Sequence, residues 1–183
     1  MNLLDLARDH IDGRYRLVHL GEPMPLPRPK VRIMPGRDGS HWPKFYLPSK
    51  ARTRMDELAS EWQRLGLPCM TGPLVCEATF ACSRPLAHLG TGANAGVVKP
   101  RYLDERPKGG DVDNCAKLIL DALEGHAFAN DDQVVRLVAE KLYADQAGLT
   151  EPQSIVELRP LADTRALFAV EPARTGPYEV EAA

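Results

Sequence analysis

Residues 109–135 read GGDVDNCAKLILDALEGHAFANDDQVV, and they place acidic side chains at both ends of an apolar run. Asp111 and Asp113 stand before the run, and Asp131 and Asp132 follow it. Carboxylates held close together repel one another and resist burial. Two interpretations are therefore open. Either these aspartates are solvated helix caps and turn residues, or they converge on a cation that relieves the repulsion.

A helix is expected over residues 114–123, because its apolar side chains recur at helical spacing. Its N-cap would be Asp113 or Asn114. Residues 111–113 are expected to be still extended, so that both carboxylates point the same way. Lys117 lies one helical turn beyond Asp113 and would reach the same cleft.

The acidic pair after the helix would complete the cluster. The connection is short, and we expect the strand that begins near Gln133 to pack beside the helix start, bringing Asp131 or Asp132 to the first pair. Three carboxylates suit Mg²⁺ or Mn²⁺. A calcium-binding EF-hand loop is excluded, because Cys115 and Ala116 stand where that loop needs an oxygen ligand and a glycine. Spacing alone leaves the metal site and the cap-and-turn interpretation both open.

The rest of the 183-residue chain indicates one domain over residues 1–160, followed by an acidic, loosely ordered tail over 161–183. A helix is expected over residues 50–65 and strands over 74–82, 133–143 and 154–160. The proline-rich stretch 20–34 should be an extended arm ending in an edge strand, and residues 36–46 a turn or mobile loop.

Composition favours a cytoplasmic protein, since the sequence contains neither a signal-peptide pattern nor an apolar stretch that could span a membrane. The four cysteines form no C-x-x-C pair and are expected to be reduced thiols. The glycine-rich loop GTGANA at 90–95 matches a relaxed dinucleotide fingerprint, but a proline-punctuated polar stretch follows it instead of a helix. No nucleotide cofactor is expected.

Charge is unevenly distributed along a chain whose net charge is −2. Between residues 28 and 54 only Asp38 is acidic, whereas the segment from residue 151 onward is acidic overall. The basic side chains of the first segment are Arg28, Lys30, Arg32, Arg37, Lys44, Lys50, Arg52 and Arg54. Such a segment is either a solvated face or a surface that binds a polyanion.

The stretch 111–135, DVDNCAKLILDALEGHAFANDDQVV, resembles the signature of the RusA-type Holliday junction resolvases. That signature runs D-h-D-N-x-x-K-x-h-x-D-A-L-x-G-x-h-h-x-D-D-x-Q-V-V, where h is apolar. The arm PMPLPRPK, the loop GTGANAG and the later AEKLYAD are also similar to longer members, so the resemblance covers Leu20 to about Leu158. With the helices and strands above, it implies an α+β fold in which a mixed or antiparallel sheet packs with two main helices.

The resemblance assigns site residues by position. Its three essential aspartates correspond to Asp111, Asp113 and Asp131, with Asp132 as the alternative third ligand, and its active-site lysine corresponds to Lys117. Two positions depart from the pattern. Asn130 stands where the family usually has the first aspartate of its pair, and Gly110 replaces a proline that commonly precedes the first aspartate.

The function implied by the resemblance is an endodeoxyribonuclease that depends on Mg²⁺, with Mn²⁺ as a substitute ion. It would resolve four-way DNA junctions by paired symmetric hydrolysis of phosphodiesters, in recombination and repair. A homodimer is expected to supply one site to each of two equivalent strands. Phosphates would be held by Arg28, Lys30, Arg32, Lys50, Arg52 and Arg54. A nuclease of forks or flaps, and a non-catalytic protein that binds branched DNA, remain the alternatives.

Overall fold

The computed structural model describes residues 13–161 of the chain. The expected acidic tail, apart from Leu161, lies outside the described residues. None of the described helices is both long and apolar enough to cross a membrane.

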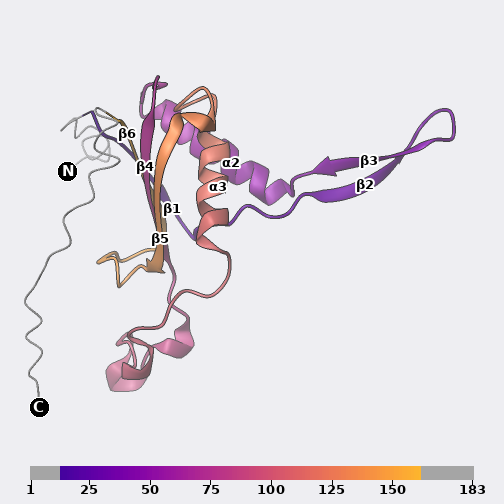
Figure 1. Cartoon of the computed structure of the whole chain (residues 1–183). Helices are drawn as coiled ribbons and strands as arrows, with labels where there is room; N and C mark the ends of the chain where they lie inside the picture. Colours follow the sequence, from indigo (N-terminus) through magenta and orange to yellow (C-terminus); the bar gives the residue numbers. More distant parts are fainter. Residues whose placement is uncertain (1–12, 162–183) are drawn as a thin grey trace, which may run out of the picture.

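A mixed four-stranded sheet in the order β1-β6-β4-β5 forms the centre of the fold (Figure 1). Its strands are β1 (Tyr15–Leu20), β4 (Leu74–Cys82), β5 (Val134–Tyr143) and β6 (Gln153–Pro160). Strand β4 pairs in parallel with β5 and antiparallel with β6, which in turn pairs antiparallel with β1. The expected α+β fold with a mixed sheet is confirmed.

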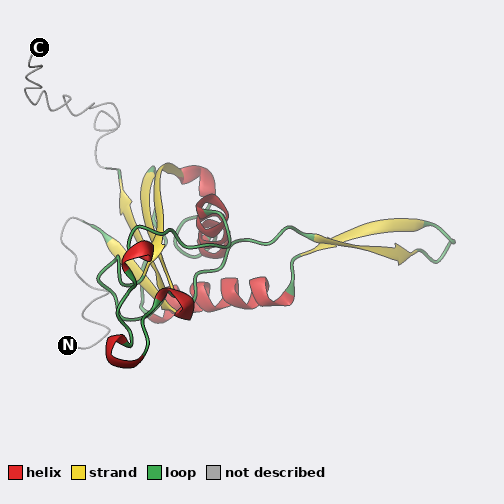
Figure 2. Cartoon of the chain, turned by 90° about the horizontal axis from the view of Figure 1, so that it is seen from below, coloured by secondary structure: helices red, strands yellow, loops and turns green. Residues whose placement is uncertain are grey.

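Two helices, α2 (Ser49–Arg64) and α3 (Val112–Leu123), cover one face of this sheet (Figure 2). Short 3₁₀ turns complete the described structure: η1 (Leu86–His88), η2 (Gly92–Asn94), η3 (Pro100–Tyr102) and η4 (Asp131–Gln133). Because β4 and β5 are parallel, the chain between them must cross over the sheet. Helix α3 makes the return part of that crossover and therefore runs antiparallel to both strands.

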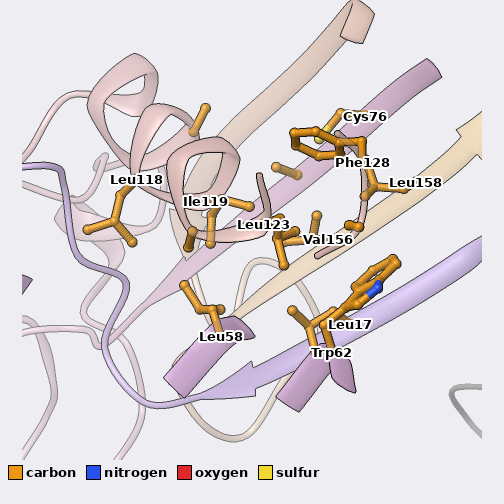
Figure 3. Packing of buried hydrophobic residues seen from close by; sticks show 14 of the residues in the cluster. Leu17, Leu58, Trp62, Cys76, Leu118, Ile119, Leu123, Phe128, Val156 and Leu158 are labelled. Carbon is orange, nitrogen blue, oxygen red and sulfur yellow. The ribbon is translucent and has the colours of Figure 1, made fainter. Parts of the chain in front are cut away.

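The core lies between the helices and the sheet (Figure 3). Helix α3 contributes Leu118, Ile119 and Leu123 at helical spacing, all at most 2 % exposed. Helix α2 contributes Leu58 and Trp62, both fully buried. The sheet meets them with the alternate residues Cys76, Ala78 and Phe80 of β4, with Val156 and Leu158 of β6, and with Leu17 of β1.

The opposite face of the sheet carries charged and polar pairs instead. Glu77 of β4 lies 3.5 Å from Arg159 of β6, and Thr79 donates a hydrogen bond to Glu140 of β5. This alternation of apolar and polar faces is why residues 74–82 were recognisable as a strand from the sequence. Strand β1 has the same alternation, with Leu17 and His19 buried, but the sequence did not predict it.

A second sheet consists only of β2 (Lys30–Pro35) and β3 (His41–Tyr46), which project from the body of the protein as a ribbon (Figures 1 and 2). The strand at the end of the proline-rich arm is therefore confirmed. The expected loop over 36–46 is wrong for its second half, because residues 41–46 pair antiparallel with β2. Only the tip, residues 36–40, is a turn.

All four cysteines are free, and Cys76, Cys82 and Cys115 are buried, as expected of reduced thiols. Burial raises the pKa of Cys76 to about 12 and that of Cys82 to about 11. Burial also raises the pKa of Cys115, which lies close to the acidic residues described below. These thiols are therefore neutral core side chains at ordinary pH.

Phe80 provides a test of this packing, because its ring is 1 % exposed between the sheet and the helices. We expect Phe80→Ala to lower the free energy of unfolding by about 3–5 kcal/mol, from lost burial and a residual cavity. The control is Leu86→Ala at a side chain that is 85 % exposed, with an expected change within about 0.5 kcal/mol. Urea denaturation measures both, and equal effects would contradict the packing.

Candidate active site

The N-terminus of α3 opens into a cleft with a volume of about 600 Å³. Asp111 is the N-cap residue of α3 and Asp113 belongs to its first turn. Both line the cleft, together with Arg106, Pro107, Lys108, Gly109, Gly110, Val112, Ala139 and Lys141. The expectation that residues 111–113 are all extended is wrong, since the helix already begins at Val112. The two carboxylates nevertheless share one cleft.

Among the described residues, no side chain binds the carboxylate of Asp111 or Asp113. Asp111 occupies the capping position, but its side chain makes no capping hydrogen bond. No hydrogen bond or ion pair within residues 13–161 involves the side chain of Asp113 either. The positive end of the helix dipole favours negative charge at this position. Both carboxylates are exposed at the helix N-terminus and are available to a cationic ligand in the cleft.

The backbone that enters the helix depends on two glycines. Gly109 and Gly110 have φ angles of 92° and 66°, which side-chain-bearing residues rarely adopt. A Cβ atom at Gly110 would also lie 2.7 Å from Cγ of Pro25. A proline, whose φ is fixed at about −65°, could not adopt the positive φ of Gly110.

Lys141, near the end of β5, holds this path in place. Its ammonium donates hydrogen bonds to the carbonyl oxygen of Gly109, at 3.1 Å, and to that of Gly110. It lines the same cleft as the two aspartates. Lys141 was not among the site residues expected from the sequence, where its only signal is its position within the AEKLYAD segment that resembles the family.

Lys117 lies on α3 one turn after Asp113, with an exposed side chain. It is not among the residues that line the cleft. Among the described residues, the lysines that line the cleft with Asp111 and Asp113 are Lys108 and Lys141.

Asp131 and Asp132 form the 3₁₀ turn η4 immediately before β5. Asn130 caps this turn by accepting a hydrogen bond from the backbone N–H of Asp132, at 3.3 Å. The side chain of Gln133 accepts hydrogen bonds from the backbone N–H groups of Ala129 and Asn130. Asn130, which replaces the aspartate usual in the family, therefore serves as the N-cap of this turn. The side chains of Asp131 and Asp132 are both exposed.

These two aspartates lie far from the cleft within one chain. Helix α3 has 12 residues and is about 18 Å long, and β5 runs antiparallel to it. Between Val134 and Lys141, β5 extends over about 23 Å, so the strand begins beside the C-terminal end of the helix. The expectation that the strand would start beside the beginning of the helix is therefore wrong. No three potential metal-binding side chains lie together among the described residues.

The long connection from β4 to α3, residues 83–111, is tied down by side chains at and just after the end of β5. Arg84 makes two hydrogen bonds of 2.9 Å to Asp145 and packs over the ring of Tyr143. These hydrogen bonds hold the pKa of Asp145 below its usual range. The hydroxyl of Tyr143 donates to the carbonyl of Arg106 at 3.1 Å. Together with Lys141, these contacts fix the connection at both of its ends.

The predicted basic residues occupy two places. Arg28, Lys30 and Arg32 lie on the arm and β2, while Lys50, Arg52 and Arg54 lie in the first turns of α2. All but Arg54 are exposed. Arg54 instead donates to the carbonyl of Glu22 and pairs with Glu57 at 3.2 Å. Five of the six side chains are therefore accessible to a ligand.

Comparison with protein families places these observations in context. Residues 21–150 match the family model described as endodeoxyribonuclease RusA. The chain belongs to the RusA endodeoxyribonuclease family, whose members are Holliday junction resolvases that hydrolyse DNA, bind branched junctions and generally depend on divalent metals. No curated protein matches the chain.

Substitution of Lys141 tests whether it positions the entry to α3. We expect Lys141→Met to reduce DNA cleavage about ten- to hundredfold and to raise the metal concentration needed for half-maximal cleavage, because the carbonyls of Gly109 and Gly110 lose their donor. Glu140→Gln on the same strand, with its side chain on the opposite face, should change both by less than threefold. Unchanged metal dependence in Lys141→Met would contradict the positioning role.

Proposed function

We propose that this protein resolves four-way DNA junctions by Mg²⁺-dependent, paired symmetric hydrolysis of phosphodiesters, in DNA recombination and repair. One observation carries the proposal. The unpartnered carboxylates of Asp111 and Asp113 share a cleft with Lys141, at the carboxyl ends of the parallel strands β4 and β5. Family membership supplies the class of reaction.

The donor set fits a divalent ion. Mg²⁺ prefers carboxylate oxygen, keeps several waters, and is often held by only one or two carboxylates together with substrate phosphate. Asp111 and Asp113 supply two such groups in a cleft open enough to admit a DNA backbone. A bound ion would lower the pKa of a water and polarise the phosphodiester. The ammonium groups of Lys141 and, from α3, Lys117 would offset negative charge on the phosphate.

We further propose that Asp131 completes the site from a second copy of the chain. Strand β5 is an edge of the sheet, and its outer part exposes Val135, Leu137 and Val138 by 44–48 %. A long edge strand with exposed apolar side chains is a template for pairing with another chain. A two-fold homodimer would align two β5 strands antiparallel.

That alignment has a direct consequence for the site. In an antiparallel pair centred near Leu137 and Val138, the start of one β5 lies beside the end of the other. Asp131 precedes the start of β5, and Lys141 and the cleft lie at its end. Asp131 of each copy would therefore approach Asp111 and Asp113 of the other. In such a dimer Asp111, Asp113 and Asp131 could bind one ion, as the family resemblance implies, although Asp131 lies far from the other two within a single chain.

Asp113→Asn tests the chemistry. We expect cleavage of a four-way junction in Mg²⁺ to fall by at least a thousandfold, while junction binding stays equal or becomes tighter, since phosphate contacts supply most of the affinity. Single-turnover cleavage and gel-shift assays on four-way, forked and linear DNA measure both properties. Parallel loss of binding and cleavage would count against the assignment. Faster wild-type cutting of forks than of four-way junctions would redirect the proposal to other branched DNA.

Mixing two inactive variants tests the shared site. Asp113→Asn and Asp131→Asn should each abolish cleavage alone. After subunit exchange, a mixed dimer would contain one site with both substitutions and one site with neither, so nicking activity should return. If each site were built from one chain, every site in the mixture would stay defective and no activity would return.

The matched control for that experiment is Asp132→Asn, in the neighbouring exposed carboxylate. We expect it to retain cleavage within about tenfold of the wild type, equivalent to roughly 1.4 kcal/mol. Light scattering on each protein should give about twice the chain mass. The reverse order of activity between Asp131→Asn and Asp132→Asn would identify Asp132 as the third ligand.

A further inference from the structure

The β2–β3 ribbon, residues 30–46, has two chemically different faces. In an antiparallel pair, directly opposed residues point to the same side and successive residues alternate. The register pairs Lys30 with Tyr46, Arg32 with Lys44 and Met34 with Trp42 on one face. The other face pairs Val31 with Phe45, Ile33 with Pro43 and Pro35 with His41. We call the first the cationic–aromatic face and the second the apolar face.

The cationic–aromatic face is free to bind a ligand. Trp42 is 50 % exposed and Tyr46 is 39 % exposed. Lys30, Arg32 and Lys44 are also exposed, and none of them pairs with a carboxylate anywhere in residues 13–161. The one acidic residue of the ribbon, Asp38, lies at the tip and is bound by Ser40. Three unneutralised cations beside two exposed aromatic rings are a surface suited to a polyanion that has flat rings.

Nucleic acid with unstacked bases has this chemistry. Proteins that bind single-stranded segments combine cations along the backbone with aromatic side chains on which bases stack. In an intact duplex the bases are stacked and paired, so a ring cannot reach their faces without opening the helix. A branch point exposes base faces beside closely spaced phosphates. The ribbon also projects away from the sheet, where it could reach DNA beyond the cleft (Figure 2).

We propose that the cationic–aromatic face of the ribbon binds the branch point of the DNA substrate, with Lys30, Arg32 and Lys44 on phosphates and Trp42 stacked on an exposed base. This rests on the proposed action on branched DNA, but it concerns recognition and not hydrolysis. The ribbon then selects branched over linear DNA, whereas the cleft at α3 carries the chemistry.

The test compares Trp42→Ala with Phe45→Ala, which removes an aromatic ring of the same ribbon from the opposite face. Binding is measured without metal, to a four-way junction and to a duplex, with 2-aminopurine placed either at the branch or within an arm. We expect Trp42→Ala to weaken junction binding at least tenfold, to leave duplex binding within twofold, and to abolish the fluorescence change at the branch. Phe45→Ala should leave all three readouts within twofold of the wild type.

The charges are tested separately by salt dependence. Arg32→Ala and Lys44→Ala should each reduce the slope of log affinity against log salt by about 1, whereas Arg64→Ala at the exposed end of α2 should leave it unchanged. Equal losses for Trp42→Ala and Phe45→Ala, or no fluorescence change at the branch with the wild type, would overturn the proposal. Because these assays need no metal, failure of cleavage alone would count against the proposed reaction and leave the ribbon's role standing.

Discussion

The parallel pairing of β4 with β5 is the constraint on which the rest of the structure depends. Parallel neighbours oblige the chain to cross over the sheet, and α3 is the helix that brings it back. The helix N-terminus therefore stands at the carboxyl ends of both strands, where ligand sites of such units form. The same constraint sends Asp131 to the opposite end of β5, so a single copy of the chain separates the acidic groups that its sequence places close together.

Periodicity predicted the elements whose two faces differ in polarity. Helices α2 and α3 and strand β4 each have one apolar side that packs in the core, and the sequence records that side directly. Strand β5 was predicted instead from the β-branched residues at its start, because its apolar side chains Val135, Leu137 and Val138 are exposed. Strand β3 was missed because it is exposed on both faces and contains Pro43, so nothing in the sequence distinguishes it from a loop. Its conformation depends on pairing with β2. Strand β1 was missed partly because buried His19, which hydrogen-bonds to Glu61, interrupts the apolar pattern.

The candidate site was predictable in part for similar reasons. Asp111 and Asp113 are neighbours in the sequence, so any local conformation keeps them close. The position of Asp131 depends on where the following strand begins. Because the connection after α3 is short, that strand begins near the C-terminal end of the helix, away from Asp111 and Asp113. Lys141 was beyond reach, because a lysine within a strand has no local signature. It is marked out in the structure by its hydrogen bonds to the carbonyls of Gly109 and Gly110, which lie more than thirty residues earlier in the chain.

The β4–α3 connection is attached at both of its ends, so the position of α3 does not depend on the length of the segment between the attachments. Arg84 fixes the beginning of the connection to Asp145, and Tyr143 and Lys141 fix its end through the carbonyls of Arg106, Gly109 and Gly110. The glycine-rich turns between these points bear on neither α3 nor the cleft. The loop at residues 90–97 is closed by the bridge between Leu89 and Val98, so a change in its length would leave the attachments that lead to Asp111 in place.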